Sequence, residues 1–394
     1  MIKSRHIMSD SEELSIYIHI PFCKKKCKYC DFLSAPASDR VQEEYFHALF
    51  EEMTTHAKEY SRQVVRSVYI GGGTPSVAGP GRLCRVLETL FSHFTVAEDA
   101  EISMEVNPGT VTGEDLSAYQ KAGVNRISIG LQSAHDKELT LLGRIHSYED
   151  FLRTYRLVRE AGFKNVNVDI MAALPGQKPE DYEDTLHKLL ALRPIPEHIS
   201  AYSLIIEEGT PFFALYGEEK EALERTGEPQ KHLPSEEEER RMYELTERLL
   251  KDAGYHQYEI SNYSLEGYEC YHNKVYWQRG DYIGFGLGAA SLIDNVRCQN
   301  HTDLQTYLKE ADKVMERTPL SVKEQMAEFM FLGLRLTKGV EKQAFYRYFG
   351  VSMEEIYGQV LRDNEKMGLL ENGERVALSK RGRDVSNYVM AQFL

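Results

Sequence analysis

Three cysteines stand close together near the start of the chain, at Cys23, Cys27 and Cys30, with the spacing Cys-x3-Cys-x2-Cys. Thiolates so close in sequence are typical ligands of soft metals and of iron–sulfur clusters. A closed structural zinc site needs four ligands, and the fourth would have to come from His19 or a distant cysteine. A [4Fe-4S] cluster held by three thiolates leaves one iron free to bind a small chelating ligand. The spacing therefore favours a cluster whose fourth iron takes part in chemistry.

The loop that carries these cysteines is rich in lysine, with Lys24, Lys25, Lys26 and Lys28 between and beside the thiols. We expect this positive charge to lower the pKa of the thiols and to offset the negative charge of a thiolate-ligated cluster. A solvated lysine-rich loop with incidental cysteines is the alternative interpretation.

The residues around the cysteines resemble a known family. The Cys-x3-Cys-x-aromatic-Cys pattern is similar to the signature of radical S-adenosylmethionine (SAM) proteins. The flanking Tyr-Ile-His-Ile-Pro-Phe and Tyr-Cys-Asp-Phe segments resemble the branch that contains the oxygen-independent coproporphyrinogen III oxidase and the haem chaperones of the HemW type, and the likeness spans nearly the whole chain. It implies that the three thiolates hold a [4Fe-4S] cluster whose fourth iron is chelated by SAM, with Tyr17 and Tyr29 lying against the SAM.

A glycine motif, Gly71-Gly72-Gly73-Thr74, follows an expected strand. Its backbone can approach a ligand closely and offer amide donors. It lacks the Lys-Ser/Thr ending of a phosphate loop, and on its own it is equally consistent with a tight turn. The resemblance implies that Gly72, Gly73 and Thr74 meet the methionyl end of SAM.

Further polar residues stand in or just after later strands. The resemblance implies that the carboxylate of Glu105 accepts hydrogen bonds from the ribose hydroxyls of SAM. It implies a SAM or substrate role for a wider set: Gln132, Arg144, Asp169, Ser203 and, in a glycine-rich strand much later in the chain, Leu292. A buried ion pair between Arg144 and Asp169 is the alternative interpretation for those two residues.

A second unusual segment reads Cys270-Tyr-His272-Asn273-Lys-Val-Tyr276-Trp277 and holds the one tryptophan of the chain. An imidazole can ligate iron, and aromatic faces can pack on a flat macrocycle. Ordinary core aromatics and a satisfied histidine are the alternative. The segment resembles the haem-binding motif of the haem chaperones, which implies that His272, Asn273, Tyr276 and Trp277 bind haem, with Cys270 as the alternative iron ligand.

Six strands, each followed by a helix, predict a parallel sheet, because parallel neighbours need crossover connections. We expect an open, TIM-type (β/α)6 partial barrel within residues 14–300, the fold that the resemblance also implies, with its site at the carboxyl ends of the strands. We expect Glu218–Arg241 to be an exposed connection, a solvated helix face and loop, ahead of a helix at Ser235–Ala253. The strands are expected at Ile16–Ile20, Val64–Ile70, Glu101–Val106, Arg126–Gln132, Asn165–Met171 and His198–Ile206.

The last part of the chain, residues 301–394, shows helical spacing followed by two short strands around an Asn-Gly turn. This pattern predicts a small α+β domain resembling a winged helix. Its charge is nearly balanced, so a packing or partner-docking role is favoured over DNA binding.

Composition sets outer limits. The chain has 394 residues and a formal net charge of -14, which argues against nonspecific binding to nucleic acid. It has no apolar run long enough to cross a bilayer, and its start lacks the apolar core of a signal peptide. Its six cysteines are too unevenly spaced for a secreted disulfide framework. We therefore expect a cytoplasmic protein without an integral membrane segment.

Two departures distinguish the branches. The oxidase resembles this chain but carries a further cysteine two positions after the third ligand, where this chain has Phe32, and a longer amino-terminal arm, where only about a dozen residues precede the first expected strand here. We therefore expect a haem chaperone that binds a [4Fe-4S] cluster, SAM and haem and delivers haem to an acceptor protein. The alternatives are SAM-dependent oxidative decarboxylation of coproporphyrinogen III, and a zinc-stabilised regulator. A flavodoxin or ferredoxin is the expected electron donor if SAM is cleaved.

Overall fold

A twelve-stranded sheet dominates the computed structural model, which describes residues 12–227 and 230–394. Within these residues the strand order is β12-β11-β10-β9-β1-β2-β3-β4-β5-β6-β8-β7, so the two ends of the sheet do not pair and the barrel is open. The run from β9 to β6 is parallel, and the strands outside it are antiparallel. Its parallel strands are β1 (Glu13–Ile20), β2 (Val64–Gly72), β3 (Thr95–Val106), β4 (Arg126–Gln132), β5 (Val166–Ala172), β6 (His198–Ser203) and β9 (Tyr282–Phe285).

The expected partial barrel is confirmed, and it is larger than six strands. The glycine-rich strand β9 lies parallel to β1 on the side away from β2. Short antiparallel strands extend both ends of the sheet: β10 (Ala290–Ile293), β11 (Val296–Asn300) and β12 (Val314–Pro319) at one end, and β8 (Asn262–Ser264) and β7 (His256–Gln257) at the other.

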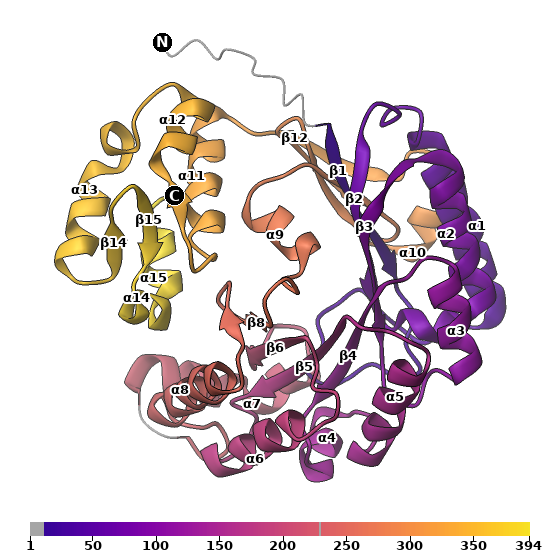
Figure 1. Cartoon of the computed structure of the whole chain (residues 1–394), viewed down its shortest axis with the longest axis horizontal. Helices are drawn as coiled ribbons and strands as arrows, with labels where there is room; N and C mark the ends of the chain where they lie inside the picture. The colour runs from indigo at the N-terminus through magenta and orange to yellow at the C-terminus, as the bar shows by residue number, and fades with distance from the viewer. Residues whose placement is uncertain (1–11, 228–229) are drawn as a thin grey trace.

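Helices cover the outer side of this curved sheet, as Figure 1 shows for α1, α2, α3 and α5. The charged region at Glu218–Arg241 contains the last turns of α7, which reaches Thr226, and the first turn of α8, which begins at Glu236 as expected. The helices of this part are α1 (Asp39–His56), the 3-10 turn η1 (Pro75–Ala78), α2 (Pro80–His93), α3 (Gly113–Lys121), α4 (Asp136–Leu142), α5 (Tyr148–Glu160), α6 (Pro179–Leu190), α7 (Pro211–Thr226), α8 (Glu236–Asp252), α9 (Tyr271–Trp277) and α10 (Leu304–Lys309).

The parallel strands have one apolar and one polar face, because successive side chains of a strand point to opposite sides. In β1, Ile16, Ile18 and Ile20 are fully buried under the helices. The alternate residues point to the other side, which we call the inner face. The inner face is polar along the whole length of the strands and includes Ser15, Tyr17, Ser67, Tyr69, Glu101, Glu105, Arg126, Ser128, Asn167, Asp169, His198 and Ser200.

A small second domain follows β12, with its own apolar cluster around Met330 and Phe345. The boundary lies near residue 320 and not at 301, because β12 pairs with β11 and Tyr307 of α10 packs in the barrel core. The domain contains α11 (Val322–Gly333), β13 (Val340–Glu341), α12 (Lys342–Phe349), α13 (Met353–Lys366), β14 (Leu370–Asn372), β15 (Arg375–Leu378), α14 (Lys380–Asp384) and α15 (Ser386–Ala391).

A buried carboxylate in α1 holds the strands after β9 against the barrel. Glu52 is 4% exposed and accepts hydrogen bonds from the Tyr307 hydroxyl at 2.7 Å, the Asn300 amide at 2.6 Å and the Gly286 backbone at 2.9 Å. Burial is the largest influence on this carboxyl and raises its pKa to about 7, while the three donors act in the opposite direction.

This pKa predicts a specific pH dependence of stability. Between the unfolded pKa of 4.5 and about 7, the folded state binds the proton of Glu52 more tightly than the unfolded chain does. The contribution of Glu52 to the free energy of unfolding therefore falls as pH rises through this window. Relative to Glu52→Gln, the wild type should lose roughly 2 kcal/mol between pH 5 and pH 8, measured by urea unfolding. Glu51→Gln, on the exposed side of α1, should keep the wild-type dependence; a wild-type curve parallel to that of Glu52→Gln would contradict the assignment.

Candidate functional site

The loop between β1 and α1, residues 21–38, carries the three cysteines and is tied to the barrel by backbone hydrogen bonds. Cys23 donates to the Ala35 carbonyl at 3.2 Å, Lys28 donates to the Leu142 carbonyl at 2.9 Å, and Phe212 donates to the Lys28 carbonyl at 3.0 Å. These contacts hold the loop across the ends of α4 and α7. The thiols therefore lie at the carboxyl ends of the parallel strands, where the sequence placed the site.

Hydrogen-bond donors converge on two of the three thiols. The Thr74 hydroxyl donates to the Cys23 sulfur at 3.5 Å, and the Arg144 guanidinium donates to the Cys27 sulfur at 3.7 Å. The same guanidinium donates to the Asn107 side-chain oxygen at 2.5 Å, and the Asn107 amide donates to the Thr74 hydroxyl at 2.7 Å. One continuous chain of donors thus begins at Arg144 and reaches both sulfurs.

This donor set fits an iron–sulfur cluster. Sulfur ligands of such clusters commonly accept hydrogen bonds, which tune the charge on the metal. Each iron of a [4Fe-4S] cluster takes one cysteine, so the three thiols need not meet at one point. Accordingly, no three His, Cys, Asp or Glu side chains in residues 12–227 and 230–394 are grouped as they would be around a single metal ion.

One electrostatic expectation for the loop was wrong. The pKa of the Cys30 thiol is raised and not lowered, because burial outweighs the opposing positive charge of Lys26. The side chains of Lys24, Lys25 and Lys26 are exposed, so water screens much of their charge.

The glycine motif begins in the last two residues of β2, Gly71 and Gly72, and packs directly beneath the cysteine loop. Gly73 donates to the Ile20 carbonyl at 2.9 Å, and Thr74 donates to the Phe22 carbonyl at 2.7 Å. Gly72 has φ +112°, and a Cβ there would lie 2.6 Å from the His19 ring. Only glycine satisfies both constraints, so the motif brings its backbone next to the loop as the sequence indicated.

Glu105 lies on the inner face near this motif. Its carboxylate accepts one hydrogen bond from the Tyr69 hydroxyl at 3.0 Å and one from the Gly72 backbone at 3.1 Å. Burial first, and the charge of Asp169 second, raise its pKa to about 7. A partly buried carboxylate that accepts from two protein donors thus lies where the ribose contact was expected.

Arg144 and Asp169 do not form the ion pair considered from sequence. Asp169 accepts hydrogen bonds from Asn167 at 2.7 Å and Ser128 at 3.2 Å, both on the inner face. Arg144 donates instead to the Gly130 carbonyl at 2.9 Å and to the groups near the cysteines. Burial raises the pKa of the Asp169 carboxyl. The charge of Arg144 lowers this pKa, but it is a weaker influence that acts without a direct contact.

The remaining expected SAM contacts lie toward the carboxyl ends of several different strands. Tyr17 lies on the inner face and donates to His19, and Tyr29 packs near Phe212 beneath the loop. Gln132 is buried at the end of β4, and Ser203 is exposed at the end of β6.

Leu292 does not lie at the carboxyl ends of the parallel strands, where the other expected SAM contacts are. The chain turns after β9, and β10 runs back antiparallel to it. Leu292 therefore pairs with Tyr282, which pairs with Ser15 at the amino end of β1, whereas the cysteine loop follows its carboxyl end. The turn itself reaches the loop, because a Cβ at Gly288 would lie 2.2 Å from the Leu33 side chain.

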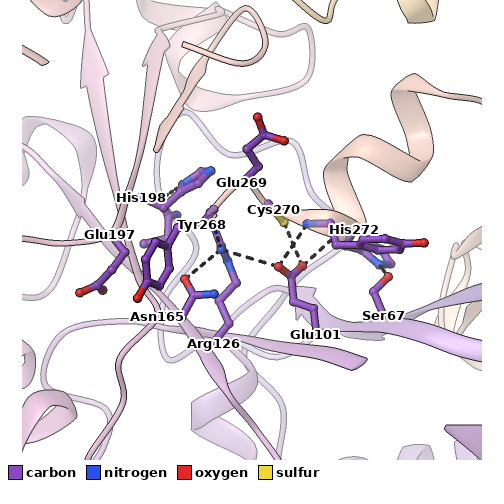
Figure 2. A network of polar contacts seen from close by, with 12 residues as sticks. Ser67, Glu101, Arg126, Asn165, Glu197, His198, Tyr268, Glu269, Cys270 and His272 are labelled. Atoms are coloured by element: carbon purple, nitrogen blue, oxygen red, sulfur yellow. Dashed lines mark hydrogen bonds and ion pairs between the residues drawn. The ribbon is translucent and has the colours of Figure 1, made fainter. Parts of the chain in front are cut away.

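The second candidate segment, α9, docks at the opposite, amino end of the strands and lies between β2 and α11 (Figure 1). Glu101 of β3 holds its start: the carboxylate accepts from the backbone of Tyr271 at 3.1 Å and of His272 at 3.2 Å, and from the Cys270 thiol at 3.4 Å. Arg126 lies 3.7 Å from the same carboxylate and balances its charge. Figure 2 shows this buried cluster.

His272 points into the inner face and is 1% exposed. Its Nδ1 lies 2.9 Å from the Ser67 hydroxyl, which donates its own proton to Ser15, so Nδ1 carries the proton. Its Nε2 then accepts from the Tyr276 hydroxyl at 3.0 Å. Desolvation lowers the pKa of His272 to about 3, which keeps the imidazole neutral.

These residues fit an iron porphyrin. A histidine that ligates a metal is neutral and donates its second ring N–H to a fixed acceptor, as His272 does to Ser67. The buried indole N–H of Trp277 has no acceptor among the residues that the structure describes, and Arg335 lies 4.3 Å above the indole ring. Cys270 fits less well as a ligand, because burial and Glu101 raise the pKa of its thiol to about 12 and the thiolate is the ligating form.

Three residues that organise the two ends were not expected from sequence. Asn107 links Arg144 to Thr74, Tyr69 lies between His272 and Glu105, and Glu101 holds α9. The available signal was the alternation of polar residues inside otherwise apolar strands, which marks a polar inner face and not an exposed edge.

Comparisons with known proteins agree with this geometry. A model described as the Radical SAM superfamily matches residues 17–189, and one described as the HemN C-terminal domain matches residues 320–385. The protein named Heme chaperone HemW from Bacillus subtilis is 36% identical over 96% of this chain and 99% of its own length. The protein of the same name from Escherichia coli is 32% identical over 97% and 98% of the two chains.

Two further likenesses extend the comparison. The mitochondrial radical S-adenosyl methionine domain-containing protein 1 of mouse is 35% identical over 94% of this chain and 86% of its own. The solved structure of the coproporphyrinogen III oxidase HemN from Escherichia coli superposes with a TM-score of 0.82, covering 97% of this chain and 90% of HemN at 21% identity. The last likeness shows the shared fold.

The hydrogen bonds that Glu101 accepts from the start of α9 predict an effect on stability. Replacing this buried carboxylate with the Glu101→Gln amide leaves fewer acceptors for three donors of α9 and leaves Arg126 without a partner charge. We expect the free energy of unfolding to fall by about 3 kcal/mol, with faster amide hydrogen exchange at residues 271–272. Glu98→Gln, exposed on the same strand, is the matched control and should change stability by less than about 0.5 kcal/mol. Equal effects of the two variants would show that Glu101 does not hold α9.

Proposed function

The chain belongs to the HemW family of radical SAM proteins, and we propose that it binds haem through α9 and delivers it to an acceptor protein. The observation that carries the proposal is His272, a buried neutral imidazole whose Nδ1 proton is committed to Ser67. Its Nε2 accepts only the Tyr276 hydroxyl, so movement of that one side chain makes a nitrogen lone pair available to iron. The family's curated members of similar length carry the name haem chaperone.

The aromatic residues of α9 supply the rest of the proposed haem site. The Tyr276 ring packs edge-on against the Tyr282 ring, with centroids 4.6 Å apart, and the ring of Trp277, the last residue of α9, lies under Arg335 of the second domain. Flat aromatic faces pack well on a porphyrin, and the unpaired indole N–H of Trp277 is suited to a propionate oxygen. Asn273, half-buried on the same helix, adds a side-chain amide. We assign haem contacts to His272, Asn273, Tyr276 and Trp277.

We further propose that the opposite end holds a [4Fe-4S] cluster on Cys23, Cys27 and Cys30, with SAM beside it. When both are bound, the cluster supplies one electron for the reduction of SAM. The Cys23 sulfur accepts a hydrogen bond from Thr74, and the Cys27 sulfur accepts one from Arg144, whose positive charge offsets the charge of a thiolate. Asn107 connects these two donors. The proposed SAM contacts are Tyr17, Tyr29, Gly72, Gly73, Thr74, Glu105, Gln132, Arg144, Asp169 and Ser203; Leu292 is left out because it lies at the other end of β1.

A reducing compartment fits the thiols, since all six cysteines are free in the structure. We therefore propose a cytoplasmic location. No helix in the described part of the chain has the length and apolar content needed to span a membrane. The loop beside the proposed cluster exposes three lysines, Lys24, Lys25 and Lys26, although the whole chain has a net charge of -14. This local positive charge suits the docking of an acidic electron carrier such as a flavodoxin or ferredoxin.

Haem titration tests the ligand assignment. His272→Ala should weaken haem affinity at least about tenfold and remove the imidazole signature from the iron absorption spectrum. Ser67→Ala, which removes the acceptor of the Nδ1 proton together with a hydrogen bond to Ser15 but keeps the imidazole, should weaken affinity by about tenfold while leaving that signature present. His187→Ala, an exposed histidine of α6, is the control and should bind as wild type does. An unchanged spectrum and affinity for His272→Ala would remove His272 as the ligand.

A second experiment separates the chaperone from the oxidase. Anaerobically reconstituted protein given coproporphyrinogen III, SAM and a reductant should form no protoporphyrinogen IX, while the same preparation binds haem. Iron and sulfide should be present in place of zinc, and Cys27→Ser should lose most of the iron. Decarboxylated product at a useful rate would identify the oxidase, and zinc with no iron would identify a zinc-stabilised protein.

A further inference from the structure

We propose that Tyr69 couples the two ends of the barrel, so that a ligand hydrogen-bonded to Glu105 loosens α9 and favours haem binding at His272. The coupling rests on the proposed function, because it joins the proposed SAM site to the proposed haem site. It adds to that function a positioning residue and an order of events: SAM first, haem more tightly afterwards.

Direct contacts connect the two ends through a single strand. The Tyr69 hydroxyl donates to Glu105 at 3.0 Å, and Glu105 also accepts from the Gly72 backbone of the glycine motif. On its other side the Tyr69 ring stacks on the imidazole of His272, with ring centroids 5.3 Å apart and an interplanar angle of 27°. Ser67, two residues earlier on β2 and on the same face, accepts the Nδ1 proton of His272.

A ligand at Glu105 changes the position of Tyr69. Each carboxylate oxygen accepts from one protein donor and keeps a second lone pair, so hydroxyl groups of a ligand share Glu105 with Tyr69 and Gly72 and weaken both hydrogen bonds. The Gly72 amide is fixed by its place in β2, so the Tyr69 side chain is the donor that adjusts. A weakened hydrogen bond at the phenol favours a shift of Tyr69 toward another partner.

Movement of Tyr69 weakens the hold on α9. In this structure the ring of Tyr69 supports one face of His272 while Ser67 and Tyr276 occupy its two nitrogens. Iron ligation requires Nε2 to leave Tyr276, so any change that destabilises this arrangement favours ligation. Because coupling between two binding sites is reciprocal, haem should raise the affinity for SAM by the same factor.

The test compares haem affinity with and without saturating SAM in cluster-reconstituted protein under anaerobic conditions. SAM should tighten haem binding by the wild type about fivefold, within the usual range of coupling between sites. Tyr69→Phe keeps the ring and loses the hydroxyl. It should bind haem without SAM about as tightly as the wild type does with SAM, and should respond no further. Tyr182→Phe removes another buried hydroxyl, which bonds Thr246 at 2.9 Å outside the inner face, and should behave as wild type.

Amide hydrogen exchange at residues 271–272 gives a second readout that needs neither ligand. Exchange in ligand-free Tyr69→Phe should be faster than in the wild type and in Tyr182→Phe. An unchanged exchange rate, or a wild-type haem affinity that SAM leaves unaltered, overturns the coupling while the haem chaperone proposal stands. A fivefold response retained in Tyr69→Phe removes Tyr69 as the link. A wild type that binds no haem overturns the proposed function and the coupling together.

Discussion

Satisfaction of buried polar groups on the inner face of the sheet determines how this protein is built. The outer face of each parallel strand is apolar and lies under helices, so the polar side chains of these strands gather on the inner face. A buried donor or acceptor without a partner costs about 1–3 kcal/mol, so pairing of these groups is strongly favoured. Glu105 with Tyr69, Asp169 with Asn167, and Glu101 with α9 are such matches. The same groups become available for exchange with ligands.

The two ends of the inner face have different characters because different chain segments close them. At the carboxyl end, a loop rich in lysine and cysteine lies over the glycine motif, and donors from Arg144 reach the sulfurs. At the amino end, one short helix inserts a neutral imidazole among serine and tyrosine hydroxyls. Exposed positive charge thus surrounds the thiols at one end, whereas at the other end the imidazole is neutral and the Glu101 charge is balanced by Arg126. That difference suits a charged cluster and an iron-ligating imidazole respectively.

The sequence predicted what is local and missed what depends on distant pairing. The cysteine spacing, the glycine motif and the alternation of strand and helix lie within short windows, and the structure places them as expected. The role of Glu101 is invisible in sequence, because its partners lie about 170 residues away in α9. Leu292 was misplaced for a related reason: its strand was identified, but the direction of β10 follows from the turn at Gly286–Gly288 and from pairing with β9. The partner of Arg144 was missed for the same reason. Arg144 donates to Asn107, which lies 37 residues earlier in the chain, and sequence spacing does not show that the two side chains meet.

The length of α9 bears on how a bound group would be released. A helix of seven residues is too short to be stable by itself, so its position depends on contacts with the rest of the molecule. Glu101 holds its first turn, Ser67 and Tyr69 hold His272, and Arg335 of the second domain covers Trp277. A change at a few of these contacts is enough to shift the helix, since no long hydrogen-bonded element must unfold with it. A carrier must give up its cargo as well as hold it, and a short helix held from two domains meets both requirements.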